Sequence, residues 1–448
     1  MKVTLFNKCL GLNDARAFGT QIMKTDPRDP EAGQAELVDC LNLTFSDDGC
    51  LENIPGFTTV LTHTAPVTSL SAGSRFFFSD GVDTNEWTGG TTVVKRFPLL
   101  TGPLCHTLLD TRLSAGAAVY RSRPGTVMEA ATVGVNPDPA TSKPLYAMPL
   151  FAHAFVYNGI AYAVNAADPR FLQYSSAYGY DLFPLGDAFI GHATAIMQAG
   201  AIPGVMVTTH AGGIMVYAGM NISDFKPRFY PCKPIDKTLF SGFVSKAVGY
   251  IHLLLCADGI YAVLPDASFV QLAEAVGKVG GLNGSYVGSA VSERKYLAVG
   301  DLCTVEYDFK NKGVLKRGSF GASAVCGYGG EIYCAIGTLI VKLATEIGTE
   351  GSMMTLPFSD FSAPGVKSFE ALYFTGTSTG EMIITATDQT GKSWEHEVCD
   401  ELANVSNYRI KTPKGTLGNH VSLKIESSGG QFRVEELQAM FAASKRSR

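Results

Sequence analysis

The sequence predicts an all-β protein whose largest part is a β-propeller of six or seven blades. Apolar runs joined by glycine turns recur along the middle of the chain, at intervals of roughly 40–50 residues, as in propeller repeats. The chain has 48 glycines in 448 residues, and charged residues make up only 17%. This composition suits short buried strands joined by tight turns better than long surface helices.

The recurring unit is an apolar run, a turn and a second apolar run, as in LLLCADGIYAVLPD at 253–266. Glycine takes the positive φ that tight hairpin turns require. A blade cannot bury both faces alone, so we expect neighbouring blades to stack around an axis and close. The predicted turns are Asn158-Gly159, Gly212-Gly213, Asp258-Gly259, Gly300-Asp301 and Gly337-Thr338, with a weaker copy at Asp80-Gly81.

The spacing of these hairpins leaves a second architecture open. The glycines of the five stronger turns lie 54, 46, 41 and 37 residues apart, so the period drifts. No WD or kelch consensus occurs. A β-sandwich with irregularly spaced hairpins is therefore the alternative to the propeller.

Two flanking regions do not follow the period, which divides the chain into three parts. Residues 1–60 are expected to form an N-terminal arm and hairpin, with a hairpin turn at Asp47-Asp48-Gly49 and a second turn at Pro55-Gly56. Residues 61–350 form the predicted propeller. Residues 355–448 form a β-sandwich-like module with a basic tail, SKRSR. The turns expected in this module are Thr379-Gly380, Thr390-Gly391 and Gly429-Gly430.

Charge and hydropathy indicate no attraction to membranes or nucleic acid. The net charge is −5 and the pI is near 5.9, so no overall field favours polyanions. Residues 188–223 carry no Asp, Glu, Lys or Arg, but Pro203-Gly204 and Gly212-Gly213 interrupt them. We predict two buried strands and a turn there rather than a membrane span. No secretory signal is visible, since Asn7-Lys8 breaks the first apolar stretch.

The ten cysteines show no C-x-x-C pair and no zinc-binding spacing. Cys256, Cys303 and Cys334 lie in apolar strand-like runs, where a free thiol behaves as a small hydrophobic group. We expect most of the cysteines to be reduced core residues. A disulfide framework is the oxidised alternative.

No sequence motif identifies an enzyme. A G-x-x-x-x-G-K-[ST] loop and an H-E-x-x-H pair are absent, and GSFGAS (318–323) and GSYVGS (284–289) have the wrong order for a G-x-S-x-G elbow. His252 lies in an apolar run, which favours a hydrogen-bonded core histidine over a catalyst. The adjacent Cys105-His106 would need spatial convergence to act as a nucleophile pair. We therefore predict a protein that is not an enzyme, with no catalytic residue.

Clusters of charge are interpreted as solvated groups. Asp80, Asp83, Asn85 and Glu86 lie in one turn, but the spacing of a calcium loop is lacking, so we predict no metal and no cofactor. Asp400-Glu401 and Glu435-Glu436 are interpreted as strand-edge or loop charges. Lys445, Arg446 and Arg448 in the tail are expected to fray, with contact to phosphate or a neighbouring acidic subunit as the alternative.

The two ends of the chain resemble a known family. The N-terminal pattern is Gly11-Leu12-Asn13, a proline loop, Glu36-Leu37, Asp39, Asn42, a turn at Gly49 and IPGF; the C-terminal pattern is TLGNHVSLKIESSGGQFRVEELQ. Both resemble the ends of bacteriophage tail nozzle, or head–tail stabilisation (tail hub), proteins of short-tailed phages. LQYSSAYGYDLFPL (172–185) and GGIMVYAGMNISDF (212–225) resemble the blade edges of that family.

The resemblance has two departures. Ile54 stands where we expect an arginine, and KGTLGN lacks the arginines of the C-terminal turn. The subfamily and the tail layer therefore stay open, and propeller proteins of long-tailed phages are an alternative.

The resemblance implies a structural virion protein that is made in the host cytoplasm and has no membrane span. A homo-oligomer, a hexameric ring in the family, would lie below the portal and its adaptor. It would extend the DNA channel, retain the packaged DNA until ejection, and anchor tail fibres or spikes. A gate loop would come from 98–150 or 221–245.

Two other functions are open for a propeller. The first is a binding module, lectin-like or a protein scaffold. Trp87 and Trp394 are not in register with the repeats, while Tyr157, Tyr217 and Tyr261 recur near the hairpins. The second is a propeller glycosidase, which needs a close pair of carboxylates. No spacing singles out such a pair.

Overall fold

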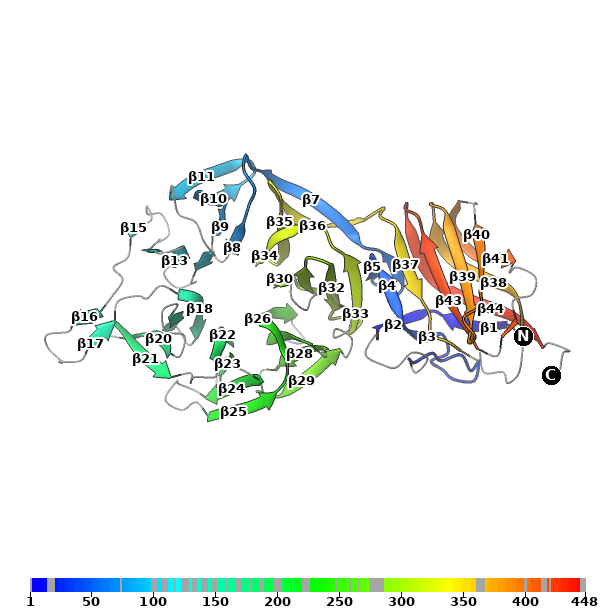
Figure 1. The fold of residues 1–448 in the computed structure, drawn as a ribbon, viewed down its shortest axis with the longest axis horizontal. Coiled ribbons are helices and arrows are strands. Elements are labelled where there is room, and N and C mark those ends of the chain that lie inside the picture. The colour runs from blue at the N-terminus through cyan, green and yellow to red at the C-terminus, as the bar shows by residue number, and fades with distance from the viewer. Residues whose placement is uncertain are drawn as a thin grey trace.

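The computed structural model of this chain consists of strands, and no helix occurs in the part that it describes (Figure 1). The described residues are 2–13, 21–72, 75–97, the strands between 104 and 196, 204–210, 212–219, 226–245, 249–257, 259–264, 266–273, 286–359, 367–398, 401–411, 417–418 and 420–443. Of the strands between 104 and 196 the structure gives the backbone only. No described helix is long and apolar enough to cross a membrane.

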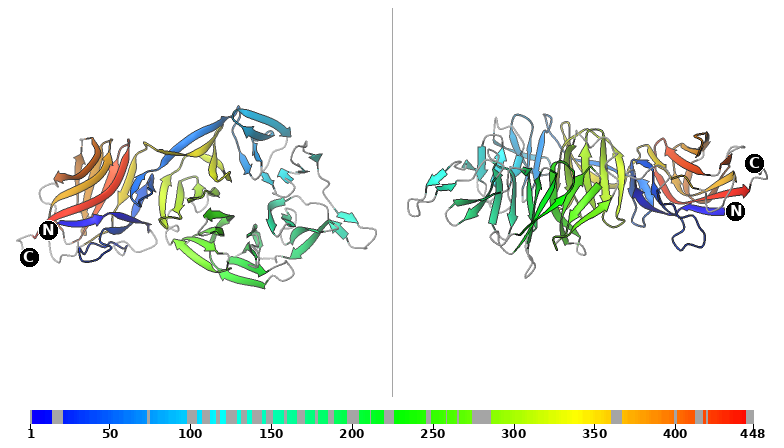
Figure 2. Two further views of the ribbon diagram at one scale, coloured as in Figure 1. Left: turned by 180° about the vertical axis from the view of Figure 1, so that it is seen from behind. Right: turned by 60° about the horizontal axis from the view of Figure 1, so that its bottom comes forward.

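Seven antiparallel sheets follow one another around an axis and form a seven-bladed propeller (Figures 1 and 2). Blade one contains β8 (Ser69–Ala72), β9 (Phe76–Ser79), β10 (Thr84–Gly89) and β11 (Thr92–Phe97). Blade two contains β12 (Leu104–His106), β13 (Arg112–Ala115), β14 (Ala118–Arg121) and β15 (Glu129–Ala130). Blade three contains β18 (Phe151–Tyr157), β19 (Ile160–Asn165), β20 (Phe171–Ser176) and β21 (Gly179–Pro184), extended by β16 (Val135–Pro137) and β17 (Pro144–Tyr146).

The other four blades follow the same order from the inner to the outer strand. Blade four contains β22 (Phe189–Ile196), β23 (Gly204–His210), β24 (Gly213–Gly219) and β25 (Lys226–Pro231). Blade five contains β26 (Pro234–Ser245), β27 (Gly249–Cys256), β28 (Gly259–Val263) and β29 (Phe269–Ala273). Blade six contains β30 (Tyr286–Val291), β31 (Lys295–Gly300), β32 (Cys303–Asp308) and β33 (Gly313–Gly318). Blade seven contains β34 (Ala322–Tyr328), β35 (Glu331–Ile336), β36 (Leu339–Ile347) and β7 (Pro55–Thr62).

The ring of blades is closed. The first strand of each blade contacts the first strand of the next, and β34 of blade seven contacts β8 of blade one. The outer strand of blade seven is β7, which precedes blade one in the chain and pairs with β36 from Leu339↔Thr62 to Ile347↔Pro55. Closure therefore joins segments from the two ends of the propeller. The predicted propeller is confirmed, with seven blades.

The turns of the predicted hairpins occupy equivalent places, with one exception. The turns near Asp80, Gly212, Asp258, Gly300 and Gly337 each join the second and third strands of a blade. In blade three, Tyr157 pairs with Ile160, so the Asn158-Gly159 turn, itself outside the described residues, joins the first and second strands. The equivalent connection in blade three spans 166–170, which accounts for the long first interval of 54 residues.

A few local predictions need correction. Pro55-Gly56 is no turn, because both residues lie in β7. The interval 188–223 contains three strands, β22, β23 and β24, rather than two. Of the segment expected to hold a gate loop, residues 226–245 are mostly strand, β25 and β26, while 221–225 lie outside the described residues. Most of 98–150 also lies outside them.

A two-sheet sandwich forms the second module, on the side of the propeller at blades six and seven (Figure 1). One sheet has the order β41 (Leu402–Lys411), β38 (Lys367–Ser378), β44 (Phe432–Ala443), β6 (Leu51–Asn53) and β5 (Leu43–Phe45), with β1 (Lys2–Phe6) on β44 and β42 (Leu417–Gly418) on β38. The other has the order β4 (Asp39–Leu41), β37 (Ser352–Thr355), β43 (Val421–Ser427), β39 (Met382–Asp388) and β40 (Ser393–Val398). A parallel pair, β2 (Lys8–Leu12) and β3 (Gln34–Leu37), lies beside it.

The N-terminal segment is part of this sandwich rather than a separate arm. The expected hairpin around Asp47-Asp48-Gly49 is formed by β5 and β6, and β6 pairs with β44. β1 also pairs with β44, with Lys2 opposite Met440. Strands from both ends of the sequence therefore share one sheet.

Two of the three predicted turns in the C-terminal module cross between its sheets. Thr379-Gly380 leads from β38 to β39, and Gly429-Gly430 leads from β43 to β44. The two crossings lie against each other, since a Cβ on Gly380 would stand 1.9 Å from the carbonyl oxygen of Gly429. Only Thr390-Gly391 is a hairpin turn, between β39 and β40.

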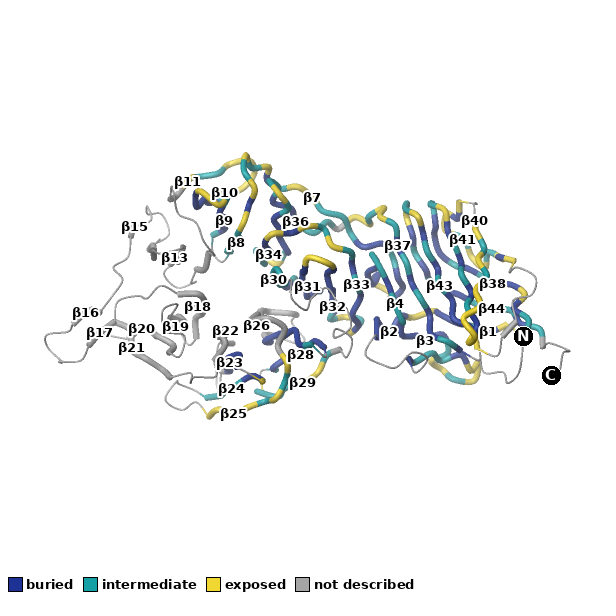
Figure 3. Tube along the Cα trace, in the orientation of Figure 1, coloured by how far each residue is buried: buried dark blue, intermediate teal, exposed yellow. Residues whose placement is uncertain are grey.

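One hydrophobic core runs through the sandwich and into the propeller. It joins residues of the two sandwich sheets, such as Phe374 and Ile425, to residues of blades five and six, such as Leu253 and Val305. Figure 3 shows this buried band crossing the junction. Burial of apolar surface is the main force that stabilises a fold, so the two modules depend on each other for stability.

Eight of the ten cysteines belong to the described residues, and all eight are free thiols. Cys9, Cys256 and Cys334 are buried in apolar surroundings. Burial raises the pKa of Cys334 to about 12, so its thiol stays protonated and unreactive. The expectation of mostly reduced core cysteines fits these eight, of which six are buried and two, Cys232 and Cys326, are half-buried.

Candidate functional site at the junction of the propeller and the sandwich

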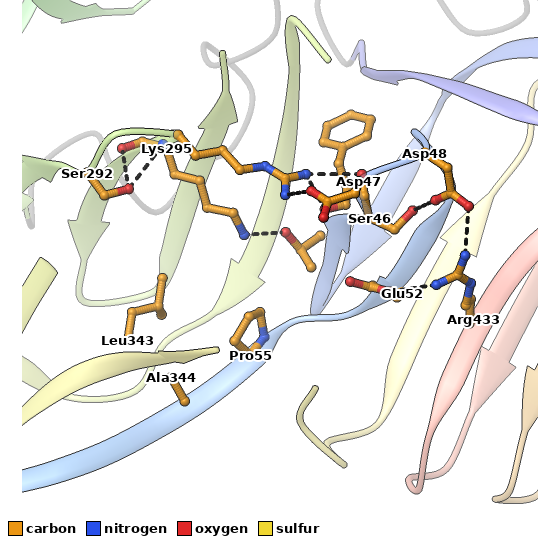
Figure 4. A pocket seen from close by; sticks show the side chains of 13 residues that line it. Ser46, Asp47, Asp48, Glu52, Pro55, Ser292, Lys295, Leu343, Ala344 and Arg433 are labelled. Atoms are coloured by element: carbon orange, nitrogen blue, oxygen red, sulfur yellow. Dashed lines mark hydrogen bonds and ion pairs between the residues drawn. The ribbon is translucent and has the colours of Figure 1, made fainter. Parts of the chain in front are cut away.

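A cavity of about 610 Å³ lies where the sandwich meets blades six and seven (Figure 4). Its wall is formed by the β5–β6 hairpin, the start of β7, the turn between β30 and β31, the end of β36, and β44. Three cationic side chains line it: Arg294, Lys295 and Arg433. We call these residues and their partners the junction cluster.

Arg294 ties the β5–β6 hairpin to blade six. Its Nε lies 2.8 Å from a carboxylate oxygen of Asp308, whose side chain is completely buried. The same guanidinium donates to the carbonyl oxygens of Phe45 and Ser46, each at 3.0 Å, and pairs with Asp47. Backbone N–H groups of the β32–β33 turn also donate to Asp308, so the carboxylate is held from both sides.

Lys295 forms a second, more deeply buried connection. Its Nζ lies 2.9 Å from Glu306 and donates to the hydroxyl of Thr44 at 2.6 Å. Thr44 in turn donates to Glu306 at 2.5 Å. Both charged residues are buried, so the pair is shielded from solvent screening. The triad links β31 and β32 of blade six to β5 of the sandwich.

Arg433 holds the same hairpin from the sandwich side. It donates to Asp48 at 2.8 Å and to Glu52 at 3.4 Å, and pairs with Glu435 at 3.0 Å. Burial raises the pKa of Glu52, and the charge of Arg433 opposes this rise. The hydrogen bond from Ser46 lowers the pKa of Asp48. The hairpin is thus held between one arginine of the propeller and one of the sandwich.

The contacts of the junction cluster hold the propeller and the sandwich together. A reaction site presents a nucleophile, or a base, to open space within reach of a substrate. Here each of the three cations is within 4 Å of a carboxylate. Arg294 also donates to carbonyl oxygens and Lys295 to a hydroxyl oxygen. Most polar groups of the cluster form contacts that hold the two modules together, while Oε2 of Glu306 and Nε of Arg433 make no hydrogen bond.

Residues that carry the family resemblance lie at this joint. Gly11 has φ +100°, and a Cβ there would lie 2.9 Å from the backbone nitrogen of Val314 on β33. Asn42 donates to the carbonyl oxygen of Gly351 and accepts from the N–H of Gly318, each at 2.9 Å. The positive φ of Asn42 directs its side chain into this bridge. The pattern that suggested a family therefore has a structural role.

Glu36, another residue of that pattern, organises the N-terminal segment itself. It accepts from the side chain of Asn13 at 2.9 Å and from the N–H of Ile22 at 2.6 Å. These bonds connect Asn13 and Ile22 to β3. β3 pairs with β2, and β2 lies beside β33, the outer strand of blade six.

The acidic turn of blade one is occupied by its own hydrogen bonds. Asp80 accepts from the N–H groups of Val82 and Asp83 and from Asn85, and lies 2.8 Å from Nε2 of His63. Burial opposes ionisation of Asp80, but the hydrogen bonds outweigh it and lower its pKa to about 2. The described residues contain no group of His, Cys, Asp or Glu placed to hold a metal.

The other two carboxylates of this turn also have cationic partners. Asp83 pairs with Lys95. Glu86 pairs with Arg75, whose Nε lies 2.6 Å from it. The interpretation of this turn as a solvated hairpin needs refinement, because Asp83 and Glu86 are buried rather than solvated.

His252 is the buried core histidine that its surroundings suggest. Its Nε2 lies 3.0 Å from the carbonyl oxygen of Val205, and its ring is completely buried. Burial lowers its pKa to about 4, so the ring is neutral at pH 7. Cys105-His106 lies on β12, whose side chains are outside the described ones.

The aromatic residues singled out in the sequence are mostly packing groups. Trp87 packs edge-on against Phe76 in blade one, with ring centroids 5.4 Å apart. Trp394 lies on β40 of the sandwich, with Lys392 over its ring. Tyr217 is buried in β24, and Tyr157 has no described side chain. Tyr261 is the exception, because it belongs to an aromatic row at the propeller surface.

The remaining predicted charges take ordinary places. Glu401 is exposed next to β41, and Asp400 lies outside the described residues. Glu435 pairs with Arg433, and Glu436 accepts from Gln438 at 2.6 Å. The tail with Lys445, Arg446 and Arg448 also lies outside the described residues.

Sequence reasoning missed the cations of the junction cluster. Arg294 and Lys295 lie in the polar turn SERK, which looks like any solvated hairpin, and Arg433 lies in the charged stretch QFRVEE at 431–436. A charge that follows an apolar strand carries no sign of a partner 247 residues away, as in Arg294 and Asp47. Only the fold, which brings the turn before β31 against the β5–β6 hairpin, reveals it.

No protein-family model and no curated protein matches the chain. Among solved structures, the WD40 repeats of RRP9 are 9% identical at a TM-score of 0.41, covering 65% of this chain and 99% of that one. Virginiamycin B lyase from Staphylococcus aureus is 11% identical at a TM-score of 0.41, and the match covers 65% of this chain and 100% of that one. The extracellular domain of the putative one component system BT4673 from B. thetaiotaomicron is 10% identical at a TM-score of 0.44. That match covers 94% of this chain and 65% of the other. These likenesses are too low to indicate a function, and the propeller assignment rests on the strand order itself.

Proposed function

We propose that this chain is a protein-binding scaffold without a reaction of its own. The propeller supplies binding surfaces, and the sandwich is held to it at a set distance and orientation. The observation that carries the proposal is the junction cluster, where Arg294, Lys295 and Arg433 lock one hairpin between the two modules. A scaffold needs this rigidity, since assembly of several partners depends on fixed spacing between their sites.

The test is the state of the chain in its natural source. A tagged chain isolated from the cells or particles that produce it should be found in an assembly of fixed stoichiometry, measured by mass photometry and cross-linking. Arg294→Met should lower the yield of that assembly because the joint loosens. Lys312→Met, in the exposed β32–β33 turn, is the matched control and should leave the yield unchanged.

Two results would contradict the scaffold function. One is a chain that is monomeric in the native extract at every concentration. The other is turnover of chromogenic glycosides by the purified chain, which would favour the glycosidase alternative.

A second candidate function is a subunit of a phage tail ring. It is favoured by the N-terminal resemblance, whose residues Gly11, Glu36 and Asn42 lie at or beside the joint. In this setting the chain is a virion protein, and copies of it form a hexameric nozzle ring between the portal-side adaptor and the fibres or spikes, through which DNA passes.

Quantitative mass spectrometry of purified particles tests this candidate. A copy number per particle equal to that of one tail ring supports it. Absence of the chain from the particles, together with soluble chain in the lysate, would exclude it and leave the general scaffold function.

A further inference from the structure

We propose that the outer rim of blades four and five binds an acidic segment of a partner protein through its side chains. This inference rests on the proposed scaffold function and names a surface and a partner chemistry for it. The rim surface is defined by residues of β25, β29 and the link after β25: Lys226, Arg228, Phe229, Tyr230, Lys233, Phe269 and Val270.

The rim surface exposes apolar groups that a folded chain usually covers. Phe229 is 48% exposed and Val270 is 37% exposed. Figure 3 shows exposed stretches of β25 and β29 along the outer edge of the propeller. By contrast, the outer strand of blade six is covered by β2, β4 and β5. Arg228 shares one face of β25 with Tyr230, and Phe229 lies on the other face of the same outer strand. Exposed aromatic and arginine side chains are typical of protein interaction sites.

An aromatic row makes this surface rigid across two blades. The ring of Tyr230 in blade four lies 5.1 Å from that of Phe269 in blade five. Phe269 stacks on Tyr261 at 4.8 Å, with 10° between the ring planes. The hydroxyl of Tyr230 donates to the carbonyl oxygen of Ala267 at 3.3 Å. A surface held in this way loses little conformational freedom when a partner binds.

The charge of the rim surface selects the partner. Lys226, Arg228 and Lys233 are all exposed, and no carboxylate pairs with them in the described part of the chain. Arg228 donates to the hydroxyl of Tyr230 at 3.1 Å. The nearby Asp266 is engaged with Ser268 in its own turn. Three exposed cations that pair with no described carboxylate, on or next to strands that also expose Phe229 and Val270, complement a segment that combines acidic and apolar residues.

Net charge favours an acidic peptide over a nucleic acid. The chain carries −5 overall, so its long-range field repels a polyanion. Affinity for nucleic acid grows with the number of phosphates neutralised, and three cations neutralise few. A short acidic segment needs only these local charges.

The backbone of β25 argues against strand addition. Pro227 and Pro231 occupy two of its six positions and donate no hydrogen bond. A partner strand at this edge would find two donors missing. The partner therefore contacts side chains instead of extending the sheet.

The experiment is a selection of displayed random peptides of about 12 residues on the immobilised full chain. Selection on the wild type should enrich peptides in which Asp and Glu alternate with apolar residues. Synthetic copies of these peptides should bind Lys226→Glu/Arg228→Glu at least about tenfold more weakly than the wild type. Phe229→Ala, which keeps the charge, should weaken binding about fivefold.

The matched control is Lys392→Glu/Lys411→Glu, which makes the same change of charge on the sandwich. It should change binding by less than about twofold, and binding to the wild type should weaken with salt. The proposal is overturned if the wild type enriches no acidic peptides, or if the enriched peptides bind the rim variant equally well. It is also overturned if a labelled single-stranded oligonucleotide binds the rim surface in preference to the peptides.

The outcome separates this inference from the scaffold function. A fixed-stoichiometry assembly that persists with Lys226→Glu/Arg228→Glu would remove the rim surface from the scaffold and leave the scaffold itself. If the wild type forms no assembly in the native extract, both the scaffold function and the role of the rim surface in it would be excluded.

Discussion

Single residues of this chain join segments that are far apart in the sequence. Asn42 bridges Gly318 and Gly351, and Arg294 reaches the hairpin that contains Asp47. In each case one side chain satisfies backbone groups or charges of another module. Buried polar groups are costly when unpaired, so a change at such a position acts at a distance.

Gly11→Ala should weaken the joint strongly. Gly11 combines a φ of +100° with a close approach to Val314, so an added Cβ brings both backbone strain and overlap. We expect a loss of about 3 kcal/mol in the free energy of unfolding. Urea denaturation followed by the fluorescence of Trp394, in a Trp87→Phe background, measures it.

Gly391→Ala is the control for backbone strain. Gly391 has φ +83°, but nothing lies within 4 Å of the position of its Cβ. Gly391→Ala should lower the free energy of unfolding by about 1 kcal/mol, which is the cost of the backbone strain alone. Equal losses for the two variants would show that the contact of Gly11 with β33 does not matter.

Asp80→Asn should make blade one less stable at neutral pH. The folded pKa of Asp80 is lowered to about 2 from an unfolded value of 3.8, so the carboxylate contributes stability above pH 4 and loses it as the pH falls towards 2. The contribution corresponds to about 2 kcal/mol at pH 7. Urea midpoints from Trp87 fluorescence should differ between variant and wild type at pH 7 and converge near pH 2.

The control is Asp301→Asn, at an exposed position, which should leave the urea midpoint unchanged at pH 7 and at pH 2. A difference between Asp80→Asn and wild type that stays constant from pH 7 to pH 2 would contradict the role given to ionised Asp80.

At the scale of elements, β7 does the most for the fold. It closes the ring as the outer strand of blade seven and leads directly from the sandwich into the propeller. Its Leu61 packs in a core shared by blades seven and one, beside Phe78 and Tyr333. Closure of the propeller therefore depends on side chains as well as on the strand ladder.

Leu61→Ala should loosen the seam between the first and last blades. Loss of a buried leucine costs about 3 kcal/mol, and the cavity lies at the closure point. Hydrogen exchange should speed up in both β9 and β35, two strands on opposite sides of the seam. Leu302→Ala, at a position that is 71% exposed, is the control and should leave exchange unchanged. Faster exchange confined to blade seven would contradict a shared core.

The sequence predicts the hairpins well and their partners poorly. Glycine turns such as Gly337-Thr338 are local signals, and the structure places this turn between Ile336 and Leu339 as a two-residue connection. The pairing of β7 with β36, or of β1 with β44, depends on contacts across hundreds of residues and leaves no local pattern. The same holds for the junction cluster.

At the scale of the whole molecule, the propeller is an insertion within the sandwich. The chain builds β1 to β6, makes the seven blades, and returns to complete both sheets with β37 to β44. Two passages, at Ile54 and at 348–351, connect the modules; the N–H of Gly348 donates to the carbonyl oxygen of Ile54. The modules should therefore unfold together.

Arg294→Met should make the sandwich and the propeller unfold at different urea concentrations. The substitution removes the contacts to Phe45, Ser46 and Asp47 and leaves Asp308 without its cation. Because a third of the Arg294 side chain is exposed, we expect a loss of about 2 kcal/mol rather than the full cost of a buried pair. Single-tryptophan versions that keep Trp87 or Trp394 should show one common urea midpoint before the change and two after it.

Lys312→Met is again the control and should leave one common midpoint. Two separate midpoints in the unsubstituted chain would contradict the view that one core unites the modules.

The pairing of β1 with β44 sets an order of events during translation. Lys2 leaves the ribosome long before Met440, its partner across the sheet, has been made. While the seven blades are synthesised, β1 lacks its partner β44, and the side chains that β1 buries in the folded chain stay exposed. β7 waits for β36 in the same way. The nascent chain therefore carries unpaired edges through most of its synthesis, and we expect chaperones to bind the segment before residue 62 until the last strand emerges.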